Sequence, residues 1–202
     1  MKIRRFGTQL GYSLFGVLVL IMMSPAPARA QDGHTHVQTS QHREPTIEER
    51  NQASALVKLV RESTERFHDV RVAKAEGYAL QFGCVSGSDV GAMGMHFVNG
   101  SLVAGGQLDV TRPQIVIYEP TSNGRLQLIG ADYLVLAEPW NATHAGPPQL
   151  MGQLFHLFES PNRFGLPAFY TLHVWAWKEN PNGTFVNWHP QVSCDGFTGT
   201  NP

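Results

Sequence analysis

The sequence predicts one α+β domain over residues 46–202, in which N-terminal helices pack on a mainly antiparallel sheet. Apolar side chains recur at helical spacing only in the first part of this domain, up to residue 76. From residue 78 onward the apolar runs are short and are separated by glycine, proline and asparagine, as is typical of strands and turns. Helices that come before the strands, instead of alternating with them, favour α+β over a parallel α/β sheet.

The first thirty residues have the pattern of a signal peptide. Residues 2–5 include three basic side chains, residues 10–23 are almost all apolar, and residues 28–30 (Ala-Arg-Ala) match a cleavage site flanked by small residues. The apolar stretch of about 14 residues is shorter than the roughly 20 needed to cross a bilayer. We therefore expect residues 1–30 to be removed on export, no stable membrane insertion afterwards, and a periplasmic or secreted protein.

The next segment, residues 31–45, is polar and holds three histidines, His34, His36 and His42. It has almost no apolar side chain with which to build a core, so we expect a flexible tail. The tail permits two interpretations: a loose binding site for copper or zinc, or a polar linker without a ligand.

The charge balance limits the partners that the exported chain can bind. Removal of residues 1–30 takes away four basic residues and no acidic ones, which leaves 11 basic against 16 acidic side chains. A mildly acidic protein without basic clusters is not expected to bind nucleic acid or to dock on anionic lipid. A small-molecule ligand is compatible with this composition, and the sequence does not indicate an oligomeric state.

Two helices are expected at the start of the domain. Thr46 and Glu49 match a capping box, and apolar residues then recur on one face of a helix from about 47 to 66. A second, short helix over 69–76 should end at Gly77, because glycine readily adopts the left-handed conformation that closes a helix.

The strands are predicted from apolar runs and from the turns between them. Residues 115–119 and 126–136 should form a hairpin around a Thr-Ser-Asn-Gly turn, with a bulge at Gly130. A further strand is expected over 169–177, and the proline-rich segment 138–150 should be a long irregular loop.

The chain has two cysteines, Cys84 and Cys194. In an oxidising compartment, an even pair this far apart in sequence predicts one disulfide that joins the start of the folded domain to its end. Two thiolate metal ligands are the alternative interpretation.

The strand expected over 169–177 carries a histidine among aromatic residues. Strand alternation places His173 on the same face as Phe169, Thr171, Trp175 and Trp177. A histidine in such surroundings needs a hydrogen-bond partner or a metal, so His173 is either a hydrogen-bonded core residue or a ligand. The side chains expected to line a pocket are Phe169, Trp175, Trp177 and His189.

Other histidines in apolar surroundings favour the metal interpretation of His173. His96, His156 and His189 all lie among apolar or aromatic residues, and Glu119 ends a predicted strand. Imidazoles with one carboxylate suit a divalent transition metal such as zinc, copper or iron, and leave a coordination position open. The predicted ligands are His96, His173, His156 and Glu119, with Glu119 alternatively acting as a catalytic general base.

Known catalytic motifs are not found in the sequence. It has no Gly-x-Ser-x-Gly nucleophile elbow, and its glycine pairs lack the lysine and Ser/Thr of a phosphate-binding loop. Asp132 beside Tyr133 and Tyr118 beside Glu119 permit an acid and base pair across the hairpin, with polar groups at a sheet edge as the alternative.

Four longer segments have a distinctive composition: Phe67-His-Asp-Val to Ala75-Glu-Gly-Tyr78, Gly94-Met-His-Phe-Val-Asn99, Arg112-Pro-Gln-Ile-Val-Ile-Tyr-Glu-Pro120 and Leu172-His-Val-Trp-Ala-Trp177. Together they resemble a family of uncharacterised exported bacterial proteins, over nearly all of residues 60–195. That family has no established activity, so the resemblance implies no reaction. A fainter likeness, through Tyr118-Glu119 and the segment from Arg125 to Tyr133, is to oil-body-associated proteins and their bacterial relatives.

Three functions are compatible with these observations. The first is an exported protein with a mononuclear metal site in an aromatic-lined pocket, where the metal activates water or dioxygen against a small organic molecule. The second is a non-catalytic binding module for an apolar or aromatic ligand, and the third is a structural or interaction protein. The metal hypothesis requires His96 and His173 to lie together, whereas the second requires each histidine to bond to a backbone carbonyl or a hydroxyl.

Overall fold

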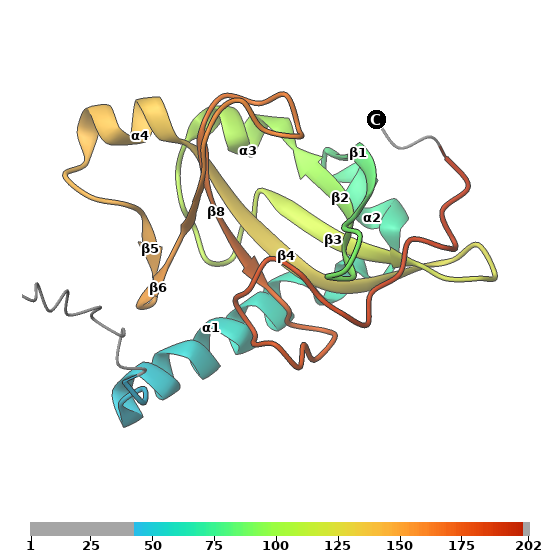
Figure 1. Cartoon of the computed structure of the whole chain (residues 1–202), viewed down its shortest axis with the longest axis horizontal. Coiled ribbons are helices and arrows are strands. Elements are labelled where there is room, and N and C mark those ends of the chain that lie inside the picture. Colours follow the sequence, from blue (N-terminus) through green and yellow to red (C-terminus); the bar gives the residue numbers. More distant parts are fainter. Residues whose placement is uncertain (1–42, 200–202) are drawn as a thin grey trace, which may run out of the picture. The chain divides into compact units, whose positions relative to one another are not determined.

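A computed structural model describes residues 43–199, so the predicted signal peptide (1–30) and nearly all of the predicted tail (31–45) lie outside the described residues. The described part contains helices and a six-stranded sheet (Figure 1), which confirms the α+β class. The elements are α1 (Ile47–Thr64), η1 (Glu65–His68), α2 (Val70–Ala75), β1 (Tyr78–Ser86), β2 (Ala92–Asn99), α3 (Gly100–Gly105), β3 (Ile115–Pro120), β4 (Leu126–Leu136), α4 (Ala137–Thr143), β5 (Gln149–Leu150), β6 (Gln153–Leu154), β7 (His156–Phe158) and β8 (Phe169–Val174).

Helix α1 begins where its sequence predicts and ends at Thr64, two residues before the predicted end, where the short helix η1 follows. The Thr46 side chain accepts a hydrogen bond from the Glu49 backbone N–H, and the Glu49 side chain accepts one from Thr46 N–H, so the capping box is present. Leu56 and Val60 on the inner face of the helix are fully buried. The short helix α2 follows, and Gly77 after it has the predicted left-handed conformation, with φ +92°.

The main sheet has the strand order β1-β2-β3-β4-β8-β7, and all its neighbouring strands are antiparallel. Strands β3 and β4 form the predicted hairpin, and the extra bulge residue is Ile129, next to Gly130. Strands β2 and β8 are separated by β3 and β4. In a flat sheet that separation would be about 14 Å, at roughly 4.8 Å per strand.

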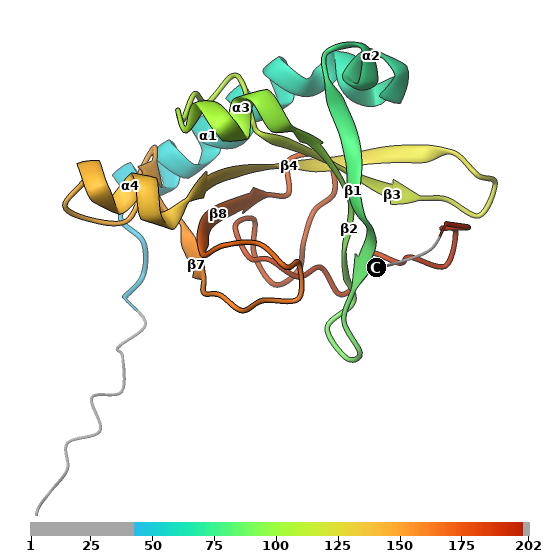
Figure 2. The same cartoon turned by 90° about the horizontal axis from the view of Figure 1, so that it is seen from above.

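The two faces of the sheet are covered differently (Figure 2). Helices α1 and α2 lie over one face, and the segments that follow β7 and β8 lie over the other. Side chains alternate between these faces along each strand, as pleating requires. On the helix face the buried residues include Leu56, Val60, Tyr118, Tyr133, Leu172 and Val174. The opposite face, which we call the site face, buries Ile115, Ile117, Leu134, Phe169, Trp175 and Val192.

Two expectations from the sequence differ from the structure. Strand β8 ends at Val174, not at residue 177, and Trp177 packs on the helix face, where its Nε1 donates to Thr64 Oγ1 at 3.0 Å. The expected irregular loop over 138–150 contains helix α4. This helix tolerates Pro139, because the first turn of a helix needs no hydrogen bond from its backbone N–H groups.

The predicted disulfide between Cys84 and Cys194 is present. It ties β1 to the C-terminal segment that crosses the site face, and disulfides of this kind persist in oxidising compartments such as the periplasm or the cell exterior. Among residues 43–199, no helix is both long and apolar enough to cross a membrane.

Candidate metal centre

His96 lies in the middle of β2 and points to the site face. Its neighbours Met95 and Phe97 belong to the helix-face core, so alternation directs His96 to the opposite side. The side chain is buried, with 6% exposed. Its Nδ1 lies 3.2 Å from the carbonyl oxygen of Gly94. Since a carbonyl can only accept, His96 carries its proton on Nδ1 and presents an unprotonated Nε2.

Asp132 and His173 lie opposite each other on the neighbouring strands β4 and β8. Both are buried, with 2% and 3% exposed. Thr171 Oγ1 donates to Asp132 Oδ1 at 2.5 Å, and Asp132 Oδ2 lies 3.6 Å from His173 Nδ1. That second distance is too long for a hydrogen bond.

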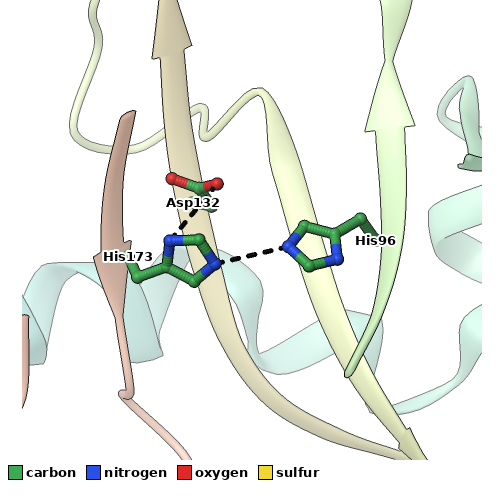
Figure 3. Close-up of side chains that lie close together, drawn as sticks. All are labelled: His96, Asp132 and His173. Carbon is green, nitrogen blue, oxygen red and sulfur yellow. Dashed lines mark hydrogen bonds and ion pairs between the residues drawn. The ribbon is translucent and has the colours of Figure 1, made fainter. Parts of the chain in front are cut away.

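The two imidazole rings meet above the strands that separate them (Figure 3). His96 Nε2 and His173 Nε2 lie 3.3 Å apart, although β3 and β4 run between their strands. With Asp132 they form a group of three ligand-type side chains, whose donor atoms all lie within 4.8 Å of one another. The buried group of His96, Asp132 and His173 is therefore able to hold a metal ion.

The hydrogen-bonding atoms of His173 are not all satisfied in this group. Within the described residues, two buried side-chain atoms have no hydrogen-bond partner, His173 Nδ1 and Asn187 Oδ1. The side chain of Asn187 lies close to His173, although no hydrogen bond forms between them. If His173 carries its proton on Nε2 and donates to His96, its bare Nδ1 faces Asp132, which is unfavourable while that carboxylate is ionised. If it carries the proton on Nδ1, two bare Nε2 atoms face each other at 3.3 Å, which is unfavourable unless a cation lies between them.

The charges of His96, Asp132 and His173 indicate that the group lacks a positive charge. Burial lowers the pKa of His96 to about 4, with a further contribution from His173, and burial lowers the pKa of His173 to about 3. Both rings are therefore neutral at pH 7. Burial raises the pKa of Asp132 to about 6, so this carboxylate is mostly ionised at pH 7. Among the described residues no lysine or arginine pairs with Asp132, so the group carries a buried, uncompensated negative charge.

The spacing of the two nitrogens fits a tetrahedral ion. With metal–nitrogen distances of about 2.0–2.1 Å, a separation of 3.3 Å corresponds to an N–metal–N angle of about 107°. A linear arrangement would need about 4 Å between the nitrogens, and a square-planar one about 2.9 Å. Tetrahedral coordination is the geometry that zinc prefers in proteins.

Two residues predicted as ligands lie elsewhere. His156 in β7 is exposed, and its Nε2 lies 3.2 Å from the Phe185 carbonyl. Glu119 at the end of β3 accepts a hydrogen bond from Lys178 Nζ at 2.6 Å and another from the Ser193 backbone N–H at 3.1 Å. Glu119 therefore anchors the C-terminal segment, and neither residue joins His96, Asp132 and His173.

The predicted pocket residues also separate. His189 is buried with both ring nitrogens occupied, since Nε2 bonds to the Glu179 carbonyl and Nδ1 accepts from Gln191 N–H. Trp175 packs edge-on against His189 on the site face, whereas Trp177 lies on the helix face. Of the four predicted pocket residues, Phe169 alone lines the cavity beside the candidate metal centre.

That cavity contains residues that the sequence analysis did not assign to a site. Asp132 was considered only as a hairpin acid or a sheet-edge group, yet an acidic residue inside the apolar run from Ile129 to Leu136 was a readable signal of a buried role. The other lining residues come from six strands and from the loop between β7 and β8, and no sequence pattern links them. They are Phe82, Met93, Ile115, Leu134, Phe158, Phe164, Leu166 and Thr171.

In the absence of metal, the free energy of unfolding is expected to fall as the pH is lowered from 6 to 5. In this range the unfolded chain binds protons on His96 and His173, whose ordinary pKa is 6.5, while the folded protein gains only the one on Asp132. The net difference of about one proton corresponds to roughly 1.4 kcal/mol per pH unit. Urea unfolding in the presence of EDTA measures this slope.

The variant His96→Gln is the control for that slope. It removes one imidazole from the unfolded chain but leaves Asp132 in the folded protein, so its slope over the same pH range should be close to zero. A wild-type stability that is constant or rises between pH 6 and 5 would contradict neutral, buried histidines.

The chain was compared with models of protein families, with functionally curated proteins and with solved structures, and nothing matched in any of the three. The resemblance to exported bacterial proteins therefore stays a prediction, and function is inferred from the chemistry of His96, Asp132 and His173.

Proposed function

We propose that this chain is an exported metalloprotein in which His96 and His173 bind one divalent transition-metal ion, with zinc favoured over copper and iron. The observation that carries the proposal is the facing of two Nε2 atoms at 3.3 Å while both Nδ1 atoms point at acceptor oxygens. An ion between the Nε2 atoms allows both rings to carry their protons on Nδ1. It therefore removes the conflict that either protonation state of His173 leaves in the metal-free group.

Asp132 has two roles in this proposal. Its carboxylate faces Nδ1 of His173, which is the carboxylate–histidine–metal arrangement that orients a ligand ring and raises its basicity. Its negative charge also compensates one of the two positive charges of the ion, and the ion in turn compensates the buried carboxylate. Thr171 holds the carboxylate in place through its 2.5 Å hydrogen bond.

The centre is of the reactive kind. Structural zinc sites are closed by four protein ligands, whereas catalytic sites have three protein ligands and a fourth position for water or substrate. This group offers two imidazoles and at most one carboxylate, and a cavity lies against all three residues. A bound ion would lower the pKa of a water molecule on the cavity side and so supply a nucleophile near neutral pH.

The predicted signal peptide and the observed disulfide support an exported location for this centre. Export places the protein where metal is bound from the periplasm or the medium, so the metal content of protein from the native host is the relevant quantity.

Elemental analysis of the mature chain, Gln31–Pro202, purified without an affinity tag from its native host, tests the proposal. We expect about one zinc, copper or iron ion per chain, lost in His96→Gln and in His173→Gln. After the ion has been removed with a chelator, titration with zinc should restore a bound ion in the wild type and in neither variant. Circular dichroism shows whether each variant is folded, so that loss of metal is separated from loss of structure.

Three controls make the result specific. His156→Gln should keep the ion, because His156 is exposed and lies outside the group. Replacement of His34, His36 and His42 by glutamine removes any contribution of the predicted tail and should also leave binding unchanged. Asp132→Asn should weaken zinc binding about 10- to 100-fold while leaving the metal-free protein at least as stable, because a buried charge is removed. A wild-type protein without metal that also fails to bind added zinc would overturn the proposal.

A further inference from the structure

We propose that the cavity beside the metal centre selects ligands by size and charge: it admits water and monoanions of up to three heavy atoms and excludes molecules that contain a ring. This inference rests on the proposed function, since it assigns the ligand class of the same site. It also differs from the apolar or aromatic ligand that the sequence suggests for a non-catalytic binding module.

The cavity runs from a half-buried mouth to a buried floor. Phe82, Phe158, Phe164 and Leu166 are each partly exposed and form the mouth. The floor is formed by the fully buried polar side chains, His96, Asp132, His173 and Thr171. The cavity wall itself is apolar, so a ligand that enters from solvent passes only apolar surface before it contacts an ion held by the histidines.

Phe164 is the centre of the mouth. Its ring lies 5.4 Å from that of Phe82 and 6.1 Å from those of both Phe158 and Phe169, each pair in an edge-to-face arrangement. Phe158 and Phe169 are in turn stacked at 5.1 Å. Contacts of this kind stabilise one arrangement of the rings, so the width of the mouth is set by packing.

The backbone under the mouth is held on both sides. Asn162 Oδ1 accepts hydrogen bonds from the backbone N–H groups of Phe164 and Leu166, and Arg163 donates to the Ser86 carbonyl at the end of β1. On the β1 side, Phe82 lies at a bulge and has a left-handed backbone, with φ +62°. Such strain is maintained where the surrounding structure requires it, and it is frequent at binding sites. The mouth is therefore built before any ligand arrives.

The free volume is too small for a ring. The cavity measures about 30 Å³, which is room for about two water molecules at roughly 10–15 Å³ each, whereas an apolar cavity that accepts benzene measures about 150 Å³. Neither Trp175 nor Trp177 lines the cavity, so these aromatic rings provide no surface for a ligand there.

The charge of the loaded site favours an anion. A divalent ion with two neutral imidazoles and the Asp132 carboxylate has a net charge of +1, and the described cavity wall has no further charged side chain. A monoanion on the ion would therefore make the buried site neutral, which lowers the cost of burying the charges. Hydroxide is the smallest such ligand, and formate is a probe of the upper size limit.

Formate and benzoate test this inference as a matched pair, because they present the same carboxylate and differ in a ring. The mature protein is loaded with cobalt(II), whose visible spectrum reports its ligands, and is titrated with each anion. In the wild type, formate should change the spectrum and benzoate should not. In Phe164→Ala, benzoate should bind at least about tenfold more tightly than in the wild type, with formate affinity little changed. Phe185→Ala, which truncates a half-buried phenylalanine packed on the helix face, should behave like the wild type.

Each outcome separates this inference from the proposed function. If cobalt does not bind, the proposed function fails and the ligand class fails with it. If cobalt binds but benzoate competes as well as formate in the wild type, or if neither anion changes the spectrum, the metal centre stands and the size selection is overturned. Unchanged benzoate affinity in Phe164→Ala would likewise overturn the assignment of Phe164 to the mouth.

Discussion

Replacement of both Cys84 and Cys194 by serine is expected to lower the free energy of unfolding by about 4 to 5 kcal/mol. The disulfide joins residues 110 positions apart, so it greatly restricts the unfolded chain. In the chain-entropy model a loop of this length gives a stabilisation of that size. For a domain with an ordinary free energy of unfolding, about 5 to 15 kcal/mol, this loss is a large fraction of the total.

The disulfide also keeps the C-terminal segment on the site face. Val192, two residues before Cys194, is 3% exposed and packs in the site-face core, and Glu119 accepts the Ser193 N–H. Guanidinium unfolding of the Cys84→Ser/Cys194→Ser protein against the oxidised wild type measures the effect. The wild type with reductant added after folding serves as a second reference, because it keeps both sulfur atoms. A loss below about 1 kcal/mol in both would contradict a stabilising role for this bond.

The second large effect is expected for Gly130→Ala, which should cost about 3 kcal/mol of stability. A Cβ atom on Gly130 would lie 2.5 Å from the backbone carbonyl oxygen of Val174 and 3.4 Å from Trp175 Cα. A backbone oxygen cannot rotate away as a side chain can, so β4 and β8 must move apart. Asp132 is two residues from Gly130 and His173 is one from Val174, so this movement should also disturb the metal centre.

Urea unfolding and zinc titration of Gly130→Ala test both parts of this prediction. Gly100→Ala is the matched control, because a Cβ atom on Gly100 meets nothing within 4 Å and the residue lies in helix α3. There, alanine should leave zinc binding unchanged and should be neutral or stabilising by up to about 1 kcal/mol. Equal stabilities for the two variants would show that β4 and β8 have room that the structure does not indicate.

Features that depend on a few neighbouring residues were predicted well from the sequence. The capping box at Thr46, the helix end at Gly77 and the hairpin of β3 and β4 follow from local hydrogen bonding and backbone preference, and all three are present. The Cys84–Cys194 pair was predicted correctly because two cysteines allow only one intramolecular disulfide.

Predictions failed where packing between distant segments overrides the local pattern. Strict alternation placed Trp177 beside His173, but β8 ends at Val174 because Trp175 N–H turns to the Thr184 carbonyl instead of continuing the ladder. The proline content of 138–150 indicated a loop, yet the first turn of α4 accommodates Pro139. For β8 the deciding contact lies outside the window that a periodicity reads, whereas for α4 the position of the proline within the helix decides.

The candidate metal centre was likewise predictable from the sequence only in part. The order of residues was enough to place His173 on the aromatic face of a predicted strand and to mark His96 as a second histidine in apolar surroundings. The sequence has four histidines in apolar surroundings, and the tertiary structure alone decides which of them come into contact. His96 and His173 are 77 residues apart and lie on strands that are not neighbours, so their contact depends on a sheet face curved enough to bring both rings together over β3 and β4. Asp132 lies beside His173 because of the register in which β4 pairs with β8. Register depends on how two strands pair, so it cannot be predicted from the sequence of either strand alone.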